Sequence, residues 1–258
     1  MGSVELPAMK NKPKIIFFTD FDGTITLKDS NDFMTDNLGY GQEKRRQGNI
    51  AVLEDRMSFR DSFRDMLDSV KTPFDKCIET LLENMQLDPY FTEFYNWACA
   101  HNVPIVILSS GMVPIIHALL VKLLGHEPDN IQIVANQVAS RDGKNINEEG
   151  GWEIVYHDGS HFGHDKSLEI KPYAALPEGE RPTLLYAGDG VSDLSAASQT
   201  DLLFAKAGHD LVTYCQRENI PYTIFEDWSS ILQKTKDIYE GKTDAKSIAE
   251  KARENNEK

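Results

Sequence analysis

Six short runs of apolar, β-branched or aromatic residues recur along the chain, and stretches with helical spacing separate most of them. They lie at residues 14–19, 103–108, 131–134, 183–187, 202–204 and 222–225. Near-continuous apolar strands that alternate with helices indicate a parallel sheet covered on both faces. Because crossovers between parallel strands are right-handed, few topologies remain, and the commonest is the doubly wound, Rossmann-like sheet. We therefore predict an α/β fold of this kind.

One long interval interrupts the alternation. Residues 20–102 have little strand character, and apolar residues recur at helical spacing over 59–70 and 78–85. A connection of this length favours a small helical cap, inserted after the first strand, over extra helical layers of the core. The predicted boundaries are residues 28–86 for the cap, with residues 1–27 and 87–258 forming the core.

The charge and cysteine content restrict the possible partners. The chain has 258 residues and a formal net charge of −14. Nucleic acids and anionic membranes require clustered Lys and Arg, so neither is an expected partner. Three separated cysteines with no CxxC pair argue against a disulfide framework. No apolar run is long enough to span a membrane and the amino-terminal residues do not resemble a signal peptide, so we expect a cytoplasmic protein.

Two aspartates follow the first apolar run directly, in the stretch FFTDFDGTIT. Asp20 and Asp22 are two residues apart, so their side chains point to the same face at the carboxyl end of a strand, where open α/β sheets bind ligands. Gly23 permits a tight turn, and Thr24 can cap that turn or hold an anion. Two carboxylates this close remain ionised only if a cation lies between them, and otherwise one of them holds a proton.

A second acidic pair follows the run at 183–187. The stretch GDGVSD contains Asp189 and Asp193, and with Asp20 and Asp22 it brings four carboxyl groups to the ends of two strands. Oxygen ligands of this kind are those that Mg²⁺ prefers. The sequence thus predicts a magnesium site at this edge of the sheet.

Two further segments carry groups that can bind phosphate. Ser109 and Ser110 end the second run and are followed by Gly111, so hydroxyl and free N–H groups meet at a strand exit. Lys166 stands at a predicted helix start, where a positive side chain is not the electrostatic preference. A bound phosphate would account for it, and a solvated surface lysine is the alternative.

An irregular segment at 136–165 contains WEIVY between turn residues, which predicts a β-hairpin beside the sheet. Within it, His157, His161 and His164 lie close together in the sequence. A second metal site there is the less favoured interpretation, because the loop contains glycines and no cysteine.

These motifs together resemble the haloacid-dehalogenase-like (HAD) phosphatases. DxDGT at 20–24, Ser109 after a strand, Lys166, and GDGxSD at 188–193 occur in the order typical of that superfamily, over nearly the whole chain. The helical insertion resembles the cap of the phosphoserine-phosphatase branch. The stretches around Asp20, Lys166 and Asp189 are most similar to fungal members that act on polyol phosphates, which are related to the methionine-salvage phosphatases.

The resemblance implies strand order 3-2-1-4-5 and a division of roles. Asp20 would attack phosphorus and form an aspartyl-phosphate, while Asp22 would protonate the leaving alcohol and then activate water. Mg²⁺ would be bound by Asp20, the backbone carbonyl of Asp22 and Asp189, with support from Asp193. Ser109 and Lys166 would hold the transferring phosphoryl group, and Ser110 and Thr24 are further phosphate-binding candidates.

The substrate is less well defined. Ser192 stands where phosphoserine phosphatases usually have Asn, and Arg64 is displaced from the position expected to bind a substrate carboxylate. An uncharged phosphorylated alcohol, most simply a polyol phosphate, is therefore favoured over phosphoserine. The candidates to contact it are Asp29, Ser30, Asn31 and Arg56. A methionine-salvage phosphatase, a phosphomutase and a non-catalytic binding protein remain alternatives, whereas Asp22 argues against a dehalogenase.

Overall fold

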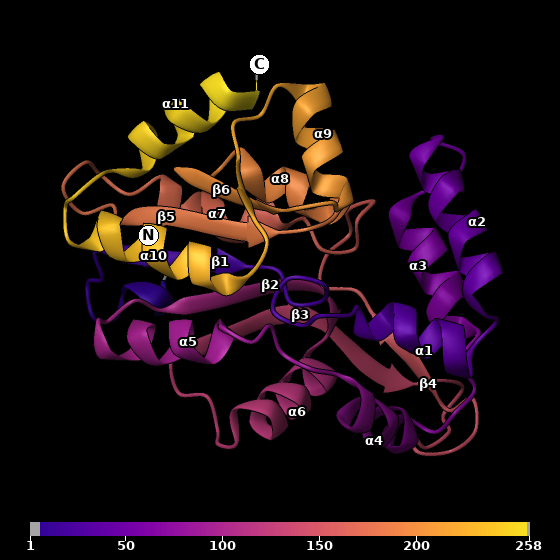
Figure 1. The fold of residues 1–258 in the computed structure, drawn as a ribbon. Helices are drawn as coiled ribbons and strands as arrows, with labels where there is room; N and C mark the ends of the chain where they lie inside the picture. The colour runs from indigo at the N-terminus through magenta and orange to yellow at the C-terminus, as the bar shows by residue number, and fades with distance from the viewer. Residues whose placement is uncertain (1–5, 257–258) are drawn as a thin grey trace.

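A computed structural model describes residues 6–256 of the chain, and its centre is a seven-stranded sheet (Figure 1). The strands are β1 (Ile15–Thr19), β2 (Ile105–Met112), β3 (Ile131–Ser140), β4 (Trp152–Val155), β5 (Thr183–Gly188), β6 (Leu202–Lys206) and β7 (Thr223–Phe225). Their order is β4-β3-β2-β1-β5-β6-β7, and all neighbours are parallel except β3 and β4. The predicted α/β class is confirmed, and the predicted order 3-2-1-4-5 corresponds to β3-β2-β1-β5-β6.

The sheet extends beyond the five strands of the predicted order at both edges. The predicted hairpin at WEIVY is confirmed, because β4 pairs antiparallel with the second half of β3, and β4 becomes an edge strand of the sheet. This pairing also explains why β3 continues to Ser140 instead of ending at Val134. At the other edge, β7 pairs with β6 and adds one more parallel strand.

Helices cover both faces of the sheet. The helices that follow residue 90 are α5 (Phe91–Ala100), α6 (Val113–Leu124), α7 (Lys166–Ala174), α8 (Leu194–Ala197), α9 (Asp210–Glu218), α10 (Trp228–Tyr239) and α11 (Ala245–Asn256). Two 3₁₀ turns lie at Pro7–Met9, before β1, and at Val191–Asp193, after β5. Alternate residues of β1 enter two separate hydrophobic clusters, Phe17 with α5, α6 and α10, and Phe18 with α7, α8 and α9. Burial on both faces accounts for the continuous apolar runs in the sequence.

Four helices lie between β1 and α5 in the sequence. They are α1 (Ser30–Leu38), α2 (Gln42–Leu53), α3 (Phe59–Asp68) and α4 (Phe74–Asn84). In Figure 1, α2 and α3 stand beyond the end of the sheet to which the arrows of β5 and β6 point. The chain enters and leaves this group side by side, because Thr26 and Leu87 form an antiparallel bridge. Their hydrophobic residues, including Phe63, Met66 and Leu81, join the cluster of the sheet face that contains Phe17.

Trp228 connects the two chain segments that lead to and from these helices. Its ring is fully buried and contacts Phe91 and Phe94, with ring centroids 4.9 and 4.7 Å away. The indole Nε1–H donates to the Thr24 carbonyl at 2.8 Å, and the backbone N–H donates to Asp88 at 3.2 Å. One residue of α10 therefore supports both the loop after β1 and the return segment.

Within residues 6–256, no helix combines the length and apolar character needed to cross a membrane.

Replacing Trp228 with Ala is expected to lower the free energy of unfolding by about 3–5 kcal/mol, because it leaves a large cavity and an unpaired Thr24 carbonyl. Urea unfolding measures the loss. Leu168→Ala is the control, since Leu168 is 49% exposed and its truncation should change stability by about 0.5 kcal/mol or less. Equal losses for the two variants would contradict this account of Trp228.

Candidate active site

Asp20 and Asp22 lie at the carboxyl end of β1, and both are almost completely buried. The Asp20 N–H donates to the Ala187 carbonyl of β5 at 2.8 Å, which continues the sheet pairing past the strand end. Gly23 then turns the chain with φ +73°, and a Cβ there would lie 2.3 Å from Asp189 Oδ2. The glycine is thus required twice, for the turn and for the close approach of the loop after β5.

Asp193 is the last residue of the 3₁₀ turn Val191–Asp193 that follows β5, and it is fully buried. Its carboxylate accepts from Lys166 Nζ at 2.6 Å, Tyr186 Oη at 2.5 Å, and the N–H groups of Asp189 at 2.9 Å and Gly190 at 3.0 Å. A Cβ on Gly188 would lie 2.4 Å from the Asp193 carboxyl carbon, so only glycine fits below it. With its lone pairs used in this way, Asp193 is suited to positioning other groups.

Lys166 is the first residue of α7 and is completely buried. Its Nζ lies 3.0 Å from Asp20 Oδ1 and 2.6 Å from Asp193 Oδ1. Burial alone would lower the pKa of this lysine, but the charges of Asp193 and Asp20 outweigh that effect and raise the pKa above its usual value. Lys166 is therefore a fixed cation beside Asp20.

Asp22 has a different environment from Asp20, although the two are only two residues apart. Its two oxygens accept from the Ser30 N–H at 2.7 Å and from Asn31 Nδ2 at 2.9 Å. Burial, followed by repulsion from Asp29, raises the pKa of Asp22 to about 8. Asp22 can therefore hold and donate a proton near neutral pH. Asp20 instead lies against Lys166, whose charge opposes the rise that burial causes in the pKa of Asp20.

The exit of β2 contributes hydroxyl and amide groups opposite Asp22. The Gly111 N–H donates to Ser109 Oγ at 2.9 Å, and a Cβ on Gly111 would lie 3.0 Å from Asp22 Oδ2. Ser110 Oγ is buried and has no hydrogen-bond partner among residues 6–256, which leaves it free for a ligand oxygen. Thr24 Oγ1 is likewise unpartnered within that range, but Thr24 does not line the cavity described next.

A cavity of about 190 Å³ lies over these groups. Its floor contains Asp20, Asp22, Ser109, Ser110, Gly111, Asp189 and Ser192, and helices α1–α3 provide much of the opposite wall, with Asn31, Asp32, Asn49, Val52, Leu53, Phe59, Phe63 and Met66. Among the residues that line it within the described part of the chain, none is Lys or Arg. The cavity therefore combines an acidic floor with a mixed polar and apolar wall.

The four substrate candidates from the sequence have different positions. Asp29 and Asn31 line the cavity, and Asp29 also caps α1 by accepting from the N–H groups of Asn31 and Asp32. Ser30 contributes its N–H to Asp22 and does not line the cavity. Arg56 lies outside, with a side chain that is 60% exposed and paired with Glu54. The structure therefore does not bring Arg56 to the site.

Some residues at the site were not found by sequence reasoning; besides cavity residues such as Asp32 and Asn49, they include His209 and Tyr186. His209 Nδ1 lies 3.0 Å from Asp189 Oδ2, and Tyr186 donates to Asp193. His209 follows the end of β6, so the rule that ligands bind at the carboxyl ends of parallel strands could have indicated it. Tyr186 lies inside an apolar strand, where nothing distinguishes it from a core aromatic residue.

The carboxylates Asp20, Asp189 and Asp193 are close enough to surround a metal ion. One oxygen from each lies within 4.8 Å of the others. Burial raises the pKa of Asp20 well above its usual value, and the charges of Asp193 and Asp189 raise it further against the opposing effect of Lys166. Burial also raises the pKa of Asp189. A dication would relieve this repulsion, and an all-oxygen donor set suits Mg²⁺. The residues present therefore fit a magnesium ion.

Comparisons with known proteins agree with this geometry. The family model for haloacid dehalogenase-like hydrolases matches residues 17–198. Pdp3-interacting factor 1 of Schizosaccharomyces pombe is 51% identical over 224 residues, which cover 86% of this chain and 95% of that protein. Polyol phosphate phosphatase PYP1 of Saccharomyces cerevisiae is 48% identical over 244 residues, which cover 92% of this chain and 98% of that one.

More distant similarities show the same fold. A 2-hydroxy-3-keto-5-methylthiopentenyl-1-phosphate phosphatase of Bacillus cereus is 27% identical over 228 residues, covering 87% of this chain and 97% of the relative. A solved structure of phosphoserine phosphatase with a phospho-aspartyl intermediate analogue superposes with a TM-score of 0.62 at 18% identity, covering 87% of this chain and 99% of that one. The resemblance to HAD-type phosphatases is thus confirmed. The chain belongs to the haloacid dehalogenase-like hydrolases.

Proposed function

We propose that this hydrolase is a Mg²⁺-dependent phosphomonoesterase that acts on a polyol phosphate through an aspartyl-phosphate intermediate. The observation that carries the proposal is the pair at the end of β1. Asp20 lies against the buried ammonium of Lys166, while Asp22 has a pKa of about 8 and holds a proton at neutral pH. A nucleophile and a proton donor are thereby present on adjacent sites of one cavity.

In the first step, the Asp20 carboxylate attacks phosphorus, and the bond between phosphorus and the alcohol oxygen breaks. Asp22 transfers its proton to that oxygen, so the product leaves as a neutral alcohol. The hydroxyl groups of Ser109 and Ser110, which line the cavity, bind the phosphoryl oxygens. Lys166 does not line the cavity, and its buried ammonium holds Asp20 at 3.0 Å. Charge neutralisation matters because two like unit charges 4 Å apart repel by about 4 kcal/mol at an effective dielectric constant near 20.

In the second step, Asp22 is ionised and takes a proton from the attacking water. The water oxygen binds phosphorus, the bond to Asp20 breaks, and inorganic phosphate leaves. The hydrogen bonds from the Ser30 N–H and Asn31 Nδ2 support this step, since they stabilise the charged form of Asp22.

Members of the HAD family of phosphatases generally use Mg²⁺. Here Asp20, Asp189 and the backbone carbonyl of Asp22 would hold it, with Asp193 as the positioning carboxylate. When bound, the ion supplies positive charge to the phosphoryl oxygens and to the carboxylates around them.

The choice of a polyol phosphate rests on the walls of the cavity. No Lys or Arg lines it within the described residues, so a substrate carboxylate would have no cationic partner. Arg64 lies over the Tyr156 ring, 5.1 Å from its centroid. Asp29, Asn31 and Asn49 offer polar groups to substrate hydroxyls. The name of the yeast relative, at 48% identity, agrees with this class.

The four helices over the site form the cap in this proposal. Residues 28–86 would be the cap and residues 1–27 and 87–258 the catalytic core. The bridge between Thr26 and Leu87 supports this boundary, because both crossing segments meet there. The cap would then choose the alcohol, while the core performs the reaction at phosphorus.

Asp20→Asn is expected to abolish steady-state release of phosphate, because the amide is a poor nucleophile. The measurement is phosphate release from para-nitrophenyl phosphate and from a hexitol phosphate with Mg²⁺, together with trapping of the phosphoenzyme by acid quench. Asp142→Asn is the matched control, since Asp142 is exposed in a turn away from the site. Turnover by Asp20→Asn at the wild-type rate would refute the mechanism.

Asp22 should matter most for substrates with poor leaving groups. In Asp22→Asn, phosphoenzyme formation from a polyol phosphate should slow by about 10²–10⁴-fold, and formation from para-nitrophenyl phosphate should slow much less, because its phenolate leaves without a proton. In the wild type, the rate with the polyol phosphate should fall as pH rises through about 8, since the raised pKa of Asp22 marks loss of its proton. Rapid-quench measurements give both rates, and equal losses for the two substrates would argue against the assignment.

The substrate class is tested by a panel of phosphate esters with the purified protein. We expect kcat/KM for polyol phosphates to exceed that for phosphoserine by about tenfold or more, because a carboxylate in this acidic cavity loses about 1.4 kcal/mol or more of binding free energy. Phosphoethanolamine and sugar phosphates complete the panel. Cleavage of a phosphoprotein, with no activity on the small esters, would exclude the proposed substrate class.

A further inference from the structure

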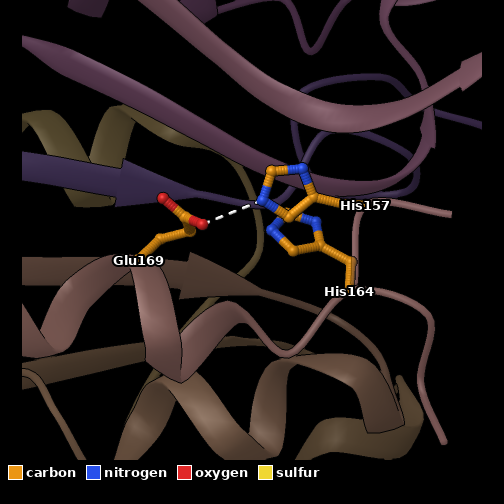
Figure 2. A group of neighbouring side chains, drawn as sticks. All are labelled: His157, His164 and Glu169. Carbon is orange, nitrogen blue, oxygen red and sulfur yellow. Dashed lines mark hydrogen bonds and ion pairs between the residues drawn. The ribbon is translucent and has the colours of Figure 1, made fainter. Parts of the chain in front are cut away.

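A second group of metal-binding side chains lies outside the acidic cluster. His157 and His164 belong to the segment between β4 and α7, and Glu169 lies in the first turn of α7. Figure 2 shows the three side chains together, with the Glu169 carboxylate directed at the ring of His157. One ligand atom from each lies within 4.8 Å of the other two. The two rings are 4.5 Å apart between centroids.

The hydrogen bond of His164 determines which ring nitrogen is available. His164 Nδ1 lies 2.9 Å from the backbone carbonyl oxygen of Ser109. A carbonyl only accepts, so Nδ1 carries the hydrogen and Nε2 carries the lone pair. Burial lowers the pKa of His164 to about 4, which keeps the ring neutral. The side chain is fully buried, and Nε2 has no hydrogen-bond partner within residues 6–256.

This arrangement is the one found around metal-binding histidines. Such a residue donates one ring N–H to a carbonyl or carboxylate and presents the other nitrogen to the ion. A buried polar atom with no partner needs an explanation, and a bound ion or an ordered water supplies one. The neighbouring histidine and carboxylate favour the ion, since they are metal ligands.

His157 and Glu169 form the outer, adjustable part of the group. His157 Nε2 lies 2.9 Å from Glu169 Oε1, and their side chains are 33% and 34% exposed. The His157 N–H donates to Asn136 Oδ1 at 2.8 Å, which fixes the backbone of the loop. His161 is not part of the group, because its ring packs against Phe162. The structure thus replaces His161 of the sequence triplet with Glu169.

We propose that His157, His164 and Glu169 form a binding site for a Zn²⁺-like transition-metal dication, distinct from the Mg²⁺ site. His164 Nε2, His157 Nε2 and one Glu169 oxygen are the protein ligands. Water takes the fourth position, which the exposure of His157 and Glu169 leaves open. Imidazole ligands favour Zn²⁺ over Mg²⁺, which prefers oxygen.

Binding requires only local adjustment. Zinc–nitrogen distances of about 2.0–2.1 Å place tetrahedral ligand atoms about 3.4 Å apart. One ligand atom from each residue lies within 4.8 Å of the others, so the partly exposed His157 and Glu169 side chains must close on the buried His164. On binding, the proton between His157 Nε2 and Glu169 moves to His157 Nδ1, and the ion takes its place.

The ion would link the end of β2, which carries Ser109, to α7, which carries Lys166. His164 is bonded to the Ser109 carbonyl, and Glu169 is one turn beyond Lys166 on α7. A bridge between them fixes the exit of β2 relative to α7.

The test is a titration of the metal-stripped full chain with Zn²⁺ in the presence of saturating Mg²⁺, followed by calorimetry and by competition with a chromophoric chelator. We expect one Zn²⁺ per chain, and affinity about tenfold weaker or worse in His157→Ala and in Glu169→Gln. Both residues are partly exposed, so these variants should remain folded, whereas His164→Gln would replace a fully buried ring. Co²⁺ in place of Zn²⁺ should give the visible absorption of a tetrahedral site, and this absorption should be lost in the same variants.

Two controls separate this site from other sources of binding. His161→Ala changes the same loop, and His117→Ala removes an exposed histidine that is paired with Glu127 elsewhere; both should bind Zn²⁺ as the wild type does. Asp189→Asn should also retain it. Loss of Zn²⁺ in Asp189→Asn with retention in His157→Ala would place the ion at the acidic cluster and overturn the proposal. Unchanged affinity in Glu169→Gln and His157→Ala, or no Zn²⁺ bound in the wild type, would overturn it as well.

Discussion

The site depends on one buried ammonium group held between two carboxylates. Lys166 contacts Asp20 at the end of β1 and Asp193 after β5, and all three groups are removed from water. Removing one partner of such a buried pair costs about 3–5 kcal/mol, because a charge then remains without compensation. Since the three residues come from β1, α7 and the turn after β5, this contact requires those elements to dock in one arrangement. That arrangement brings Asp20 and Asp189 together.

The residues that line the cavity come from two parts of the fold. The groups proposed to react with phosphorus lie on loops that a seven-stranded sheet fixes, whereas much of the opposite wall comes from α1–α3. Asn31 belongs to both, since it lines the cavity and donates to Asp22. Through this contact, the start of α1 would favour the ionised form of Asp22, the acid of the proposed reaction. The proposed zinc site is also linked to the cavity, because its ligand His164 is hydrogen-bonded to the Ser109 carbonyl near the end of β2.

Much of the core and of the site's acidic centre could be predicted, because short-range rules control both. The doubly wound parallel sheet follows from alternation and handed crossovers, whereas the order of its five strands comes from the family resemblance. Asp20 and Asp22 share a face because strands have a period of two. Other features depend on packing between distant segments. The run at 131–134 does not show that β3 continues to Ser140 to pair with β4. The direction of Arg56, in the turn between α2 and α3, has no local signal. Glu169 joins His157 only because α7 docks beside that loop, so sequence proximity favoured His161 instead.

The hydrogen bond from Trp228 to the Thr24 carbonyl joins residues 204 positions apart. The loop that carries Asp20 and Asp22 is made early in translation, but its support is made only when α10 leaves the ribosome. Until then, the cluster of Phe17, Phe91 and Phe94 lacks the indole that covers it. A nascent chain of this protein therefore carries Asp20 and Asp22 long before Trp228 can support the loop that follows them.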